Sequence, residues 1–222
     1  MKALTITKLY DLNHTLAAPY LERFTYPWEA LGGLGDFIAA LGNELPVEEY
    51  EKIGEQIWAA KSAVIAPTAS IKGPAIIGKE TEVRHCAFIR GNVLVGEACV
   101  VGNSTELKNV ILFDHVQVPH YNYVGDSILG YYSHMGAGSI TSNVKSDKTL
   151  VVIKAGELRL ETGRKKVGGM LGDHVEIGCG TIVNPGSVIG PNTSVYPLSM
   201  VRGYVPANSI YKNQGEVVEK EL

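Results

Sequence analysis

The sequence predicts a mainly β protein, a solenoid of short strands that follows a small helical segment. An aliphatic residue recurs at every sixth position along two long runs, and a small side chain follows most of these residues four positions later. The chain also has 25 glycines against 4 phenylalanines, which indicates many tight turns and few bulky core layers. A helix repeats every 3.6 residues and a strand every two, so neither produces a period of six. A coil built from flat sides and corners does.

Residues 1–61 precede the repeat and differ from it. Two stretches, 26–42 and 46–63, space their apolar residues three and four apart, and the second begins with acidic residues, as helix starts favour. We therefore expect two helices that pack on the first coil as a cap. The aromatic residues assigned to this cap and its contact with the coil are Trp28, Phe37, Tyr50 and Trp58.

The repeat itself occupies residues 62–212. The first run of in-phase residues is Ile65, Ile71, Ile77, Val83, Ile89, Val95, Val101, Leu107 and Phe113, and the second is Leu171, Ile177, Val183, Ile189, Val195 and Val201. In each hexad the large residue fills the interior, the small one packs the corner, and glycine, asparagine or aspartate takes the strained turn angles. A series of ordinary β-hairpins would need variable spacings instead.

The repeat is interrupted twice. Its phase would put Pro119 in the core, so the stretch "VPHYNYVGD" at 118–126 breaks it, and we expect a wall shaped there for a ligand, with His120 turned outward. Residues 142–170 form a longer insertion with seven basic residues and three acidic ones. This insertion is either a solvated hairpin or a site for a phosphate or nucleotide tail. Residues 213–222 form a C-terminal tail.

Composition narrows the classes of function. A net charge of −3 gives no electrostatic case for nucleic acid or an acidic membrane surface as partner. Three widely spaced cysteines suggest neither a disulfide framework nor a Cys-x-x-Cys metal site, and no pair of histidines has ligand-type spacing, so no metal is expected. There is no signal-peptide pattern and no apolar run long enough for a membrane span. We expect a cytoplasmic protein.

The segment "RGNVLVGEACVVGNSTELKNVILFDHVQVPHYNYVGDSILGYYSHMGAGSITSN" combines hexads with H-x-x-Y-x-G-D and then G-A-G-[ST]-I-T-x-N. It resembles the hexapeptide-repeat acyltransferases, and within them the acetyltransferase half of the bifunctional UDP-N-acetylglucosamine synthesis enzyme, over residues 62–212. "TGRKKVGGMLGDHVEIG" is similar to the archaeal sugar-1-phosphate nucleotidylyltransferases that share this half. The resemblance implies a left-handed parallel β-helix with three hexads per coil. It also implies a homotrimer with sites at subunit boundaries, and acetyl-CoA as co-substrate.

The resemblance also implies roles for individual residues. His120 matches the general base, Ala137 falls in the segment that faces acetyl-CoA, and the positions that match sugar-phosphate contacts are Arg90, Lys108, Tyr123, Asn143 and Lys148. Four positions depart from the family pattern: His134 replaces an asparagine at the substrate site, and Cys179, Pro197 and Lys212 stand at coenzyme positions as a serine, an alanine and an arginine do in the family. With three hexads per coil, Arg90 and Lys108 stack on one outer wall, with either Glu106 or a sugar phosphate between them.

These residues suit acetyl transfer to the amine of a hexosamine 1-phosphate, with glucosamine 1-phosphate as the expected acceptor. The amine must lose a proton as it attacks the thioester, and a neutral histidine can take that proton. Galactosamine 1-phosphate or a hydroxyl of a sugar nucleotide is another possible acceptor. A second class of function is a non-catalytic one: sugar-nucleotide binding, or a trimerising scaffold for a separate nucleotidyltransferase. Residues 1–61 match no nucleotidyltransferase loop, so uridylyl transfer is not expected.

Overall fold

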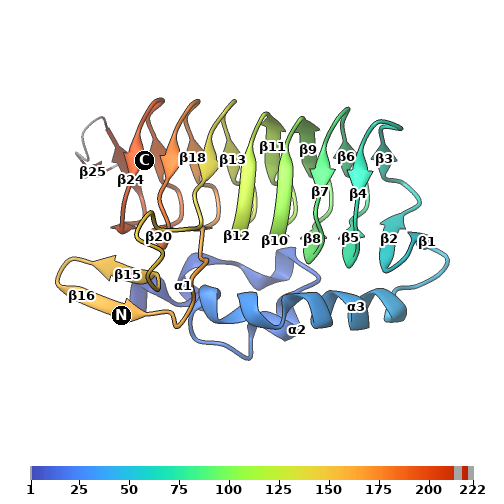
Figure 1. Cartoon of the computed structure of the whole chain (residues 1–222), viewed down its shortest axis with the longest axis horizontal. Helices are drawn as coiled ribbons and strands as arrows, with labels where there is room; N and C mark the ends of the chain where they lie inside the picture. Colours follow the sequence, from blue (N-terminus) through green and yellow to red (C-terminus); the bar gives the residue numbers. More distant parts are fainter. Residues whose placement is uncertain (1, 213–216, 220–222) are drawn as a thin grey trace.

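The computed structural model describes residues 2–212 and 217–219, and its main body is a left-handed parallel β-helix of about nine turns (Figure 1). Each coil has three flat sides, and each side stacks in register on the same side of the next coil. The predicted fold class, a mainly β solenoid with a helical N-terminal segment, is confirmed.

Three stacks of strands run the length of the solenoid, and we name them faces 1, 2 and 3 in the order in which the chain visits them from β3 onward. Face 1 contains β3 (Val64–Ile65), β6 (Glu82–Val83), β9 (Val100–Asn103), β11 (Gln117–His120), β13 (His134–Met135), β18 (Glu176–Ile177), β21 (Ser194–Val195) and β24 (Ser209–Tyr211), with β25 (Val217–Glu219) antiparallel to β24. Face 2 contains β4 (Ser70–Ile71), β7 (Phe88–Ile89), the first halves of β10 (Glu106–Leu112) and β12 (Tyr123–Leu129), β14 (Ile140–Thr141), β19 (Ile182–Val183) and β22 (Met200–Val201). Face 3 contains β2 (Ile57–Ala60), β5 (Ala75–Ile77), β8 (Val93–Val95), the second halves of β10 and β12, β17 (Gly169–Leu171), β20 (Ser187–Ile189) and β23 (Tyr204–Val205).

The interior is filled as the hexads predict. In-phase aliphatic residues stack on one another, as Ile71, Ile89 and Leu107 do in neighbouring coils. The small residues between them are buried at the corners, and their hydroxyls bond to backbone carbonyls inside the coil, as Thr81 Oγ1 does with the oxygen of Gly96 at 2.8 Å. Buried hydroxyls are therefore mostly satisfied, and the core tolerates serine and threonine.

The prediction that glycine, asparagine or aspartate would take the turn angles is wrong in part. Several corners do use these residues, such as Asn92 and Asp126, but many others hold residues outside the three predicted types. These include Cys86, Ser104, His115, Tyr121, Tyr132, His174 and Leu198. Stacking in a regular solenoid fixes the corner geometry at every coil, so packing offsets the backbone cost of about 1–2 kcal/mol at such a residue.

The expected interruption at 118–126 is also wrong. Leu107 pairs with Ile89, which lies 18 residues earlier, but Leu112 pairs with Val95, which lies only 17 residues earlier. One residue is thus missing from the corner inside β10, and β12 has the same short corner. The stretch around Val118 remains in the regular wall as part of β11 and β12, with no loop inserted.

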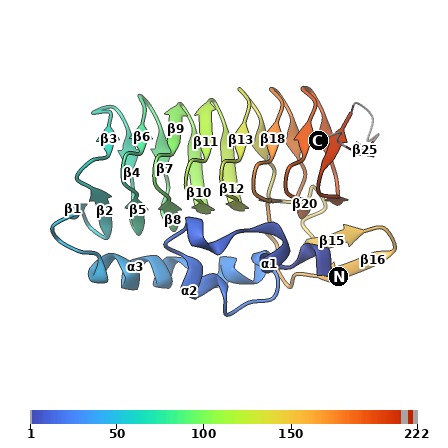
Figure 2. The same ribbon diagram turned by 180° about the vertical axis from the view of Figure 1, so that it is seen from behind.

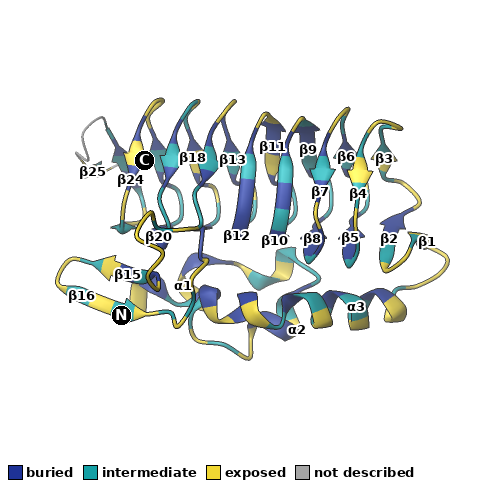
Figure 3. Ribbon diagram, in the orientation of Figure 1, coloured by how far each residue is buried: buried dark blue, intermediate teal, exposed yellow. Residues whose placement is uncertain are grey.

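The N-terminal segment lies along face 3 rather than on the first coil alone (Figures 1 and 2). Its helices are η1 (Lys2–Leu4), α1 (Ile6–Leu9), η2 (Leu12–His14), α2 (Ala18–Leu21), η3 (Pro27–Gly32) and α3 (Leu34–Glu44). Backbone hydrogen bonds join Asp114 to His14 and Asp173 to Leu9 near the middle of the solenoid. Since both sides of face 3 are covered, its strands β5, β8, β17 and β20 are fully buried (Figure 3).

The second predicted helix, at 46–63, is wrong: the chain forms β1 (Tyr50–Gly54) and β2, an antiparallel pair that starts face 3. Pairing of β2 with β5 provides a hydrogen-bonded partner that the local helical spacing does not reveal. The first predicted helix is confirmed as η3 and α3. The aromatic residues Trp28, Tyr50 and Trp58 are buried where this segment meets the solenoid, as expected.

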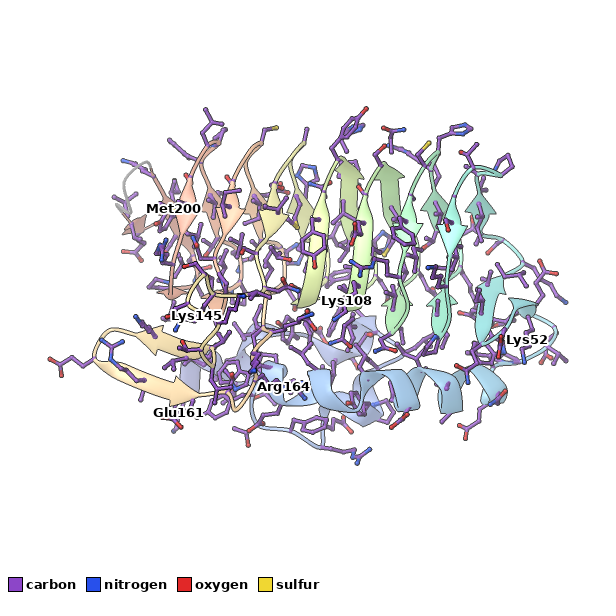
Figure 4. All side chains as sticks on the ribbon, viewed as in Figure 1. Lys52, Lys108, Lys145, Glu161, Arg164 and Met200 are labelled. Carbon is purple, nitrogen blue, oxygen red and sulfur yellow. The ribbon has the colours of Figure 1, made fainter. Side chains whose placement is uncertain are left out.

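The basic insertion forms an antiparallel hairpin of β15 (Val152–Ala155) and β16 (Leu158–Glu161). It is not fully solvated, because Val151 and Ile153 are completely buried and Val151 packs at Gly186 of the solenoid. The hairpin lies beside the N-terminal segment, and Arg164 reaches Gly32 in that segment (Figure 4). The insertion therefore has a fixed position on the β-helix.

Gly42 provides a test of the contact between α3 and the solenoid. A Cβ at Gly42 would overlap the indole of Trp58, which is buried, whereas a Cβ at Gly35 in the same helix would meet only the side-chain amide of Asn92. We expect Gly42→Ala to lower the free energy of unfolding by about 2 kcal/mol despite better helix propensity. Gly35→Ala should stay within about 0.5 kcal/mol of wild type, because an amide side chain can rotate away. Equal effects in urea denaturation would contradict this packing.

Candidate active site

The most connected polar group on the outer wall is the carboxylate of Asp126, at the short corner of β12. It accepts hydrogen bonds from Lys108 Nζ at 3.2 Å, Asn109 Nδ2 at 2.9 Å and Asn143 Nδ2 at 2.5 Å. Only 5% of its side chain is exposed. Asn143 also donates to the hydroxyl of Tyr123 at 3.1 Å. We call Lys108, Asn109, Tyr123, Asp126 and Asn143 the Asp126 cluster.

The chain reaches this arrangement through the two short corners. Lys108 and Asn109 turn the corner of β10, and Gly125 and Asp126 turn the next corner directly above it. Gly125 leaves no room for a side chain, since a Cβ there would overlap the hydroxyl of Tyr123. Three of the predicted substrate residues, Lys108, Tyr123 and Asn143, are thus brought together around the carboxylate of Asp126.

Tyr123 keeps its proton in this setting. Burial raises the pKa of Tyr123 above its ordinary value, and the Asp126 carboxylate raises it further. Its hydroxyl accepts from Asn143, which leaves the hydroxyl proton available to an oxygen or nitrogen of a ligand on face 2.

Arg90 and Lys108 stack on adjacent coils of face 2, as predicted from their spacing. Each is already paired with a carboxylate: Arg90 Nη1 lies 2.5 Å from Glu106 Oε1, and Lys108 Nζ lies 3.2 Å from Asp126 Oδ1. Glu106 and Asp126 therefore balance these two charges within the chain. The hydrogen bond to Glu106 raises the pKa of the exposed Arg90, which stays positive in any case.

His120 lies at the corner between faces 1 and 2, three residues before Tyr123. Its side chain is exposed and makes no hydrogen bond or ion pair with any residue that the structure describes. Its backbone is held firmly, because its amide donates to Asn122 Oδ1 at 3.1 Å and the Asn122 amide donates to Gly136 and Ser139 of the next coil. A fixed backbone with a free imidazole suits a proton acceptor.

Ala137, Cys179 and Pro197 lie in line with His120 along the same edge of the solenoid. The amide of Gly138 donates to the carbonyl of His120, that of Gly180 to Ala137, and that of Leu198 to Cys179, at 3.0, 2.9 and 2.8 Å. The four residues therefore occupy equivalent corner positions of four successive coils, and all four are exposed. We call them the corner row.

Three other predicted residues lie elsewhere. His134 is on face 1, where its Nδ1 lies 2.9 Å from Glu176 Oε2. Lys148 is exposed in a turn of the insertion, outside the Asp126 cluster. Lys212 is half-buried after β24, near the end of the described residues, and the predicted tail at 213–222 lies largely outside them.

Sequence reasoning missed Asp126 and Asn122 as organising residues. Asp126 ends the H-x-x-Y-x-G-D motif, but its partners are set by the two short corners, which the hexad pattern conceals. Within the described residues there is no group of three His, Cys, Asp or Glu side chains that could hold a metal ion. A search of the same residues finds no helix that is long and apolar enough to cross a membrane.

The three cysteines differ in exposure. Burial raises the pKa of the Cys99 thiol to about 12, whereas Cys86 and Cys179 are exposed at corners. Because the thiolate is the reactive form, we expect two alkylations of the native chain at pH 8 and a third only in denaturant. Intact mass spectrometry measures the count, and Cys86→Ser should reduce the native count to one. Rapid labelling of Cys99 in the folded chain would contradict its burial.

Comparison with known proteins identifies the family of this chain. Residues 71–197 match the family model described as the GMPPB C-terminal domain. The bifunctional protein GlmU of Methanococcus maripaludis (strain C5) is 30% identical over 205 residues, which cover 91% of this chain and 50% of that protein. The bifunctional sugar-1-phosphate nucleotidylyltransferase/acetyltransferase of Sulfurisphaera tokodaii is 31% identical over 166 residues, 67% of this chain and 41% of that one. The chain thus spans about half the length, or less, of these curated relatives.

Among solved structures, a mutant of AntD, an N-acyltransferase from Bacillus cereus in complex with dTDP and coenzyme A, aligns with 78% of this chain and 91% of its own, at 19% identity and a TM-score of 0.43. The family match covers more than half of the chain, and it agrees with the resemblance that the hexads and the H-x-x-Y-x-G-D motif indicate. The chain belongs to the GMPPB C-terminal domain family, and so to the hexapeptide-repeat proteins.

Proposed function

We propose that this chain transfers the acetyl group of acetyl-CoA to the amine of an amino sugar that carries an anomeric phosphate, with glucosamine 1-phosphate as the first acceptor to test. The observation that carries this proposal is the position of His120. It belongs to the corner row, and it precedes Tyr123 of the Asp126 cluster by three residues. A free imidazole thus stands between the two groups of residues that we assign to the two substrates.

The corner row suits a long coenzyme. Its side chains at Ala137 and Cys179 are small, so an extended molecule could follow the edge of the coils from His120 toward the C-terminal end. The Asp126 cluster suits a sugar, because it offers the ammonium of Lys108 and the phenol of Tyr123 as donors, and the amide oxygen of Asn143 as an acceptor, at fixed positions. The name of the relative from S. tokodaii, which includes a sugar-1-phosphate nucleotidylyltransferase and an acetyltransferase, agrees with this pairing.

The chemistry requires one proton acceptor and no protein nucleophile. The amine nitrogen attacks the thioester carbon, and His120 takes the proton that the nitrogen loses. The C–S bond breaks and the thiolate of coenzyme A leaves with a proton, which His120 can return. Tyr123 and Asn143 hold the sugar. The orientation of the amine toward the thioester provides the remaining rate acceleration.

Acetyl transfer is tested by the release of coenzyme A thiol with glucosamine 1-phosphate, galactosamine 1-phosphate and nucleotide-linked amino sugars as acceptors. Turnover with at least one of them supports the proposal. Absence of turnover with all of them would overturn it, and would favour the alternative of a non-catalytic sugar-nucleotide-binding or scaffold protein.

Labelling of the two exposed cysteines tests the coenzyme position separately. We expect saturating acetyl-CoA to slow alkylation of Cys179 at least about fivefold, because a bound ligand excludes the reagent. Cys86, which occupies a positive-φ corner on an earlier coil, should react at an unchanged rate and serves as the matched control. Equal rates at Cys179 with and without acetyl-CoA would remove it from the coenzyme site.

We also propose that the chain forms a homotrimer. Large apolar side chains are exposed near the corner row: Tyr121 at 66%, Leu198 at 83% and Met200 at 58%. An apolar strip of this kind beside polar groups is typical of a protein interface. Light scattering should give the mass of three chains, and Leu198→Asp should reduce it to that of one. A wild-type monomer would contradict the proposal.

A further inference from the structure

A pocket of about 680 Å³ lies between the basic hairpin and the C-terminal coils of the solenoid. It belongs to the corner between faces 2 and 3, the opposite edge of face 2 from the corner row. Its walls come from the end of β14, from the hairpin, and from the turns that follow β19 and β22. This volume lies in the range of pockets that bind small molecules.

The pocket is strongly positive. Lys145, Lys154, Arg159 and Arg202 line it, with Asp147 as the single carboxylate in its lining. Asp147 pairs with Lys145 at 3.1 Å. The other three cations form no ion pair with any residue in the described part of the chain, and Arg202 Nη2 lies 3.7 Å from the sulfur of Met200.

The contrast with Arg90 and Lys108 is informative. Those two cations, which sequence assigns to the sugar phosphate, are each balanced by a carboxylate at 2.5 and 3.2 Å. The cations without a carboxylate partner, Lys154, Arg159 and Arg202, lie at the hairpin pocket instead. Mutually repelling cations around one cavity are stabilised when an anion with several charges binds between them.

The pocket adjoins the Asp126 cluster through one short stretch of chain. Asn143 points to Asp126 and Tyr123, while Ser142, Val144 and Lys145 on either side of it line the pocket. Successive residues of an extended chain advance by about 3.3 Å, so the two sites are contiguous. Figure 4 shows Lys108 and Lys145 on this side of the solenoid, above the N-terminal segment and the hairpin.

We infer that the hairpin pocket binds the diphosphate of a nucleotide, and that the acceptor is an amino sugar linked to a nucleoside diphosphate. Lys154, Arg159 and Arg202 contact the phosphates, and the sugar extends over the Asp126 cluster with its amine toward His120. The assignment of the sugar rests on the proposed function; binding of the diphosphate does not. Coenzyme A also carries a diphosphate, but the residues assigned to it follow the opposite edge of face 2, which favours the acceptor as the source.

The test is calorimetric titration with uridine diphosphate, inorganic diphosphate and acetyl-CoA, on the full chain at low and high salt. The test variant is Lys154→Ala/Arg159→Ala. Its matched control is Lys165→Ala/Lys166→Ala, which removes the same charge from exposed positions of the same insertion outside the pocket. Circular dichroism and thermal melting confirm that each variant is folded.

We expect wild type to bind uridine diphosphate and inorganic diphosphate, with affinity that falls as salt rises. The test variant should lose at least about tenfold in both affinities, and the control less than about twofold. Equal losses in both variants, or no binding of either diphosphate by wild type, would overturn the proposal. A loss confined to acetyl-CoA would also overturn it, by assigning the pocket to the coenzyme.

The outcome is independent of turnover. If the chain binds uridine diphosphate through Lys154 and Arg159 but transfers no acetyl group, the proposed function fails and the diphosphate pocket stands. If acetyl transfer to glucosamine 1-phosphate is unaffected in the test variant and uridine diphosphate does not compete with it, the pocket has no part in acceptor binding and the inference about the acceptor fails.

Discussion

Replacement of His120 by alanine is expected to lower kcat for acetyl transfer by about 10²- to 10⁴-fold, the usual contribution of a positioned general base. The KM values for both substrates should change little, because the imidazole makes no contact that organises the Asp126 cluster. The measurement is thiol release from acetyl-CoA under saturating conditions, with the best acceptor found for wild type.

The structure indicates that this variant will fold. The side chain of His120 is exposed, and the corner is held by its backbone amide and by Asn122, neither of which the substitution removes. Loss of activity together with an unchanged melting temperature would therefore report chemistry rather than unfolding.

His174 supplies the matched control. It is an exposed histidine at a positive-φ corner of the same β-helix, but its ring stacks with Tyr132 on another edge of the solenoid. His174→Ala should retain at least about half of the wild-type kcat. If His120→Ala keeps more than about a tenth of wild-type kcat, another group accepts the proton and His120 is a ligand contact at most.

The sequence predicted the β-helix well because its period of six is a direct consequence of the coil. Each in-phase residue reflects the same coil geometry, so a few local exceptions do not hide the six-residue period. The stacking of Arg90 on Lys108 was predicted from the coil length of 18 residues. This length still holds there, because the first short corner comes after Lys108. The segment at 50–60 was predicted less well, because a strand there depends on pairing with β5, a contact that no local spacing records.

The candidate site was predictable in its residues and not in its connections. Tyr123 and Asn143 are 20 positions apart, and only the coil register brings the hydroxyl of one to the amide of the other. The role of Asp126 could not be predicted from the sequence for a different reason. A corner shortened by one residue shifts the phase without leaving a loop, so the break at 118–126 looked like an insertion when it was a deletion.

Asp126 therefore carries the second large prediction. Asp126→Ala should lower the free energy of unfolding by about 3 kcal/mol, because it leaves the ammonium of Lys108 and two amides without their common acceptor in a largely buried site. It should also raise KM for the acceptor at least about tenfold, since Lys108 and Asn143 lose their fixed positions. Chemical denaturation and steady-state kinetics measure the two effects.

Two further variants separate charge from backbone geometry. Asp126 has a φ of 48°, a conformation that asparagine also tolerates, so Asp126→Asn keeps the corner. It removes the charge and replaces one acceptor oxygen with an NH2 donor, which faces the amide of either Asn109 or Asn143. In a double-mutant cycle with Lys108→Met, the ion pair should appear as a coupling free energy of at least about 1 kcal/mol. No coupling would mean that the ammonium is solvated and the carboxylate serves the two amides alone.

Asp114 tests whether the change in KM is specific to face 2. It is a half-buried carboxylate that accepts a backbone hydrogen bond from Glu97 at 2.8 Å, on a different corner of the solenoid. Asp114→Ala should also destabilise the fold, by about 1–2 kcal/mol, and leave KM for the acceptor unchanged. If Asp114→Ala and Asp126→Ala raise KM equally, the effect comes from a loosened β-helix. If only Asp126→Ala raises it, this carboxylate holds the acceptor site in shape.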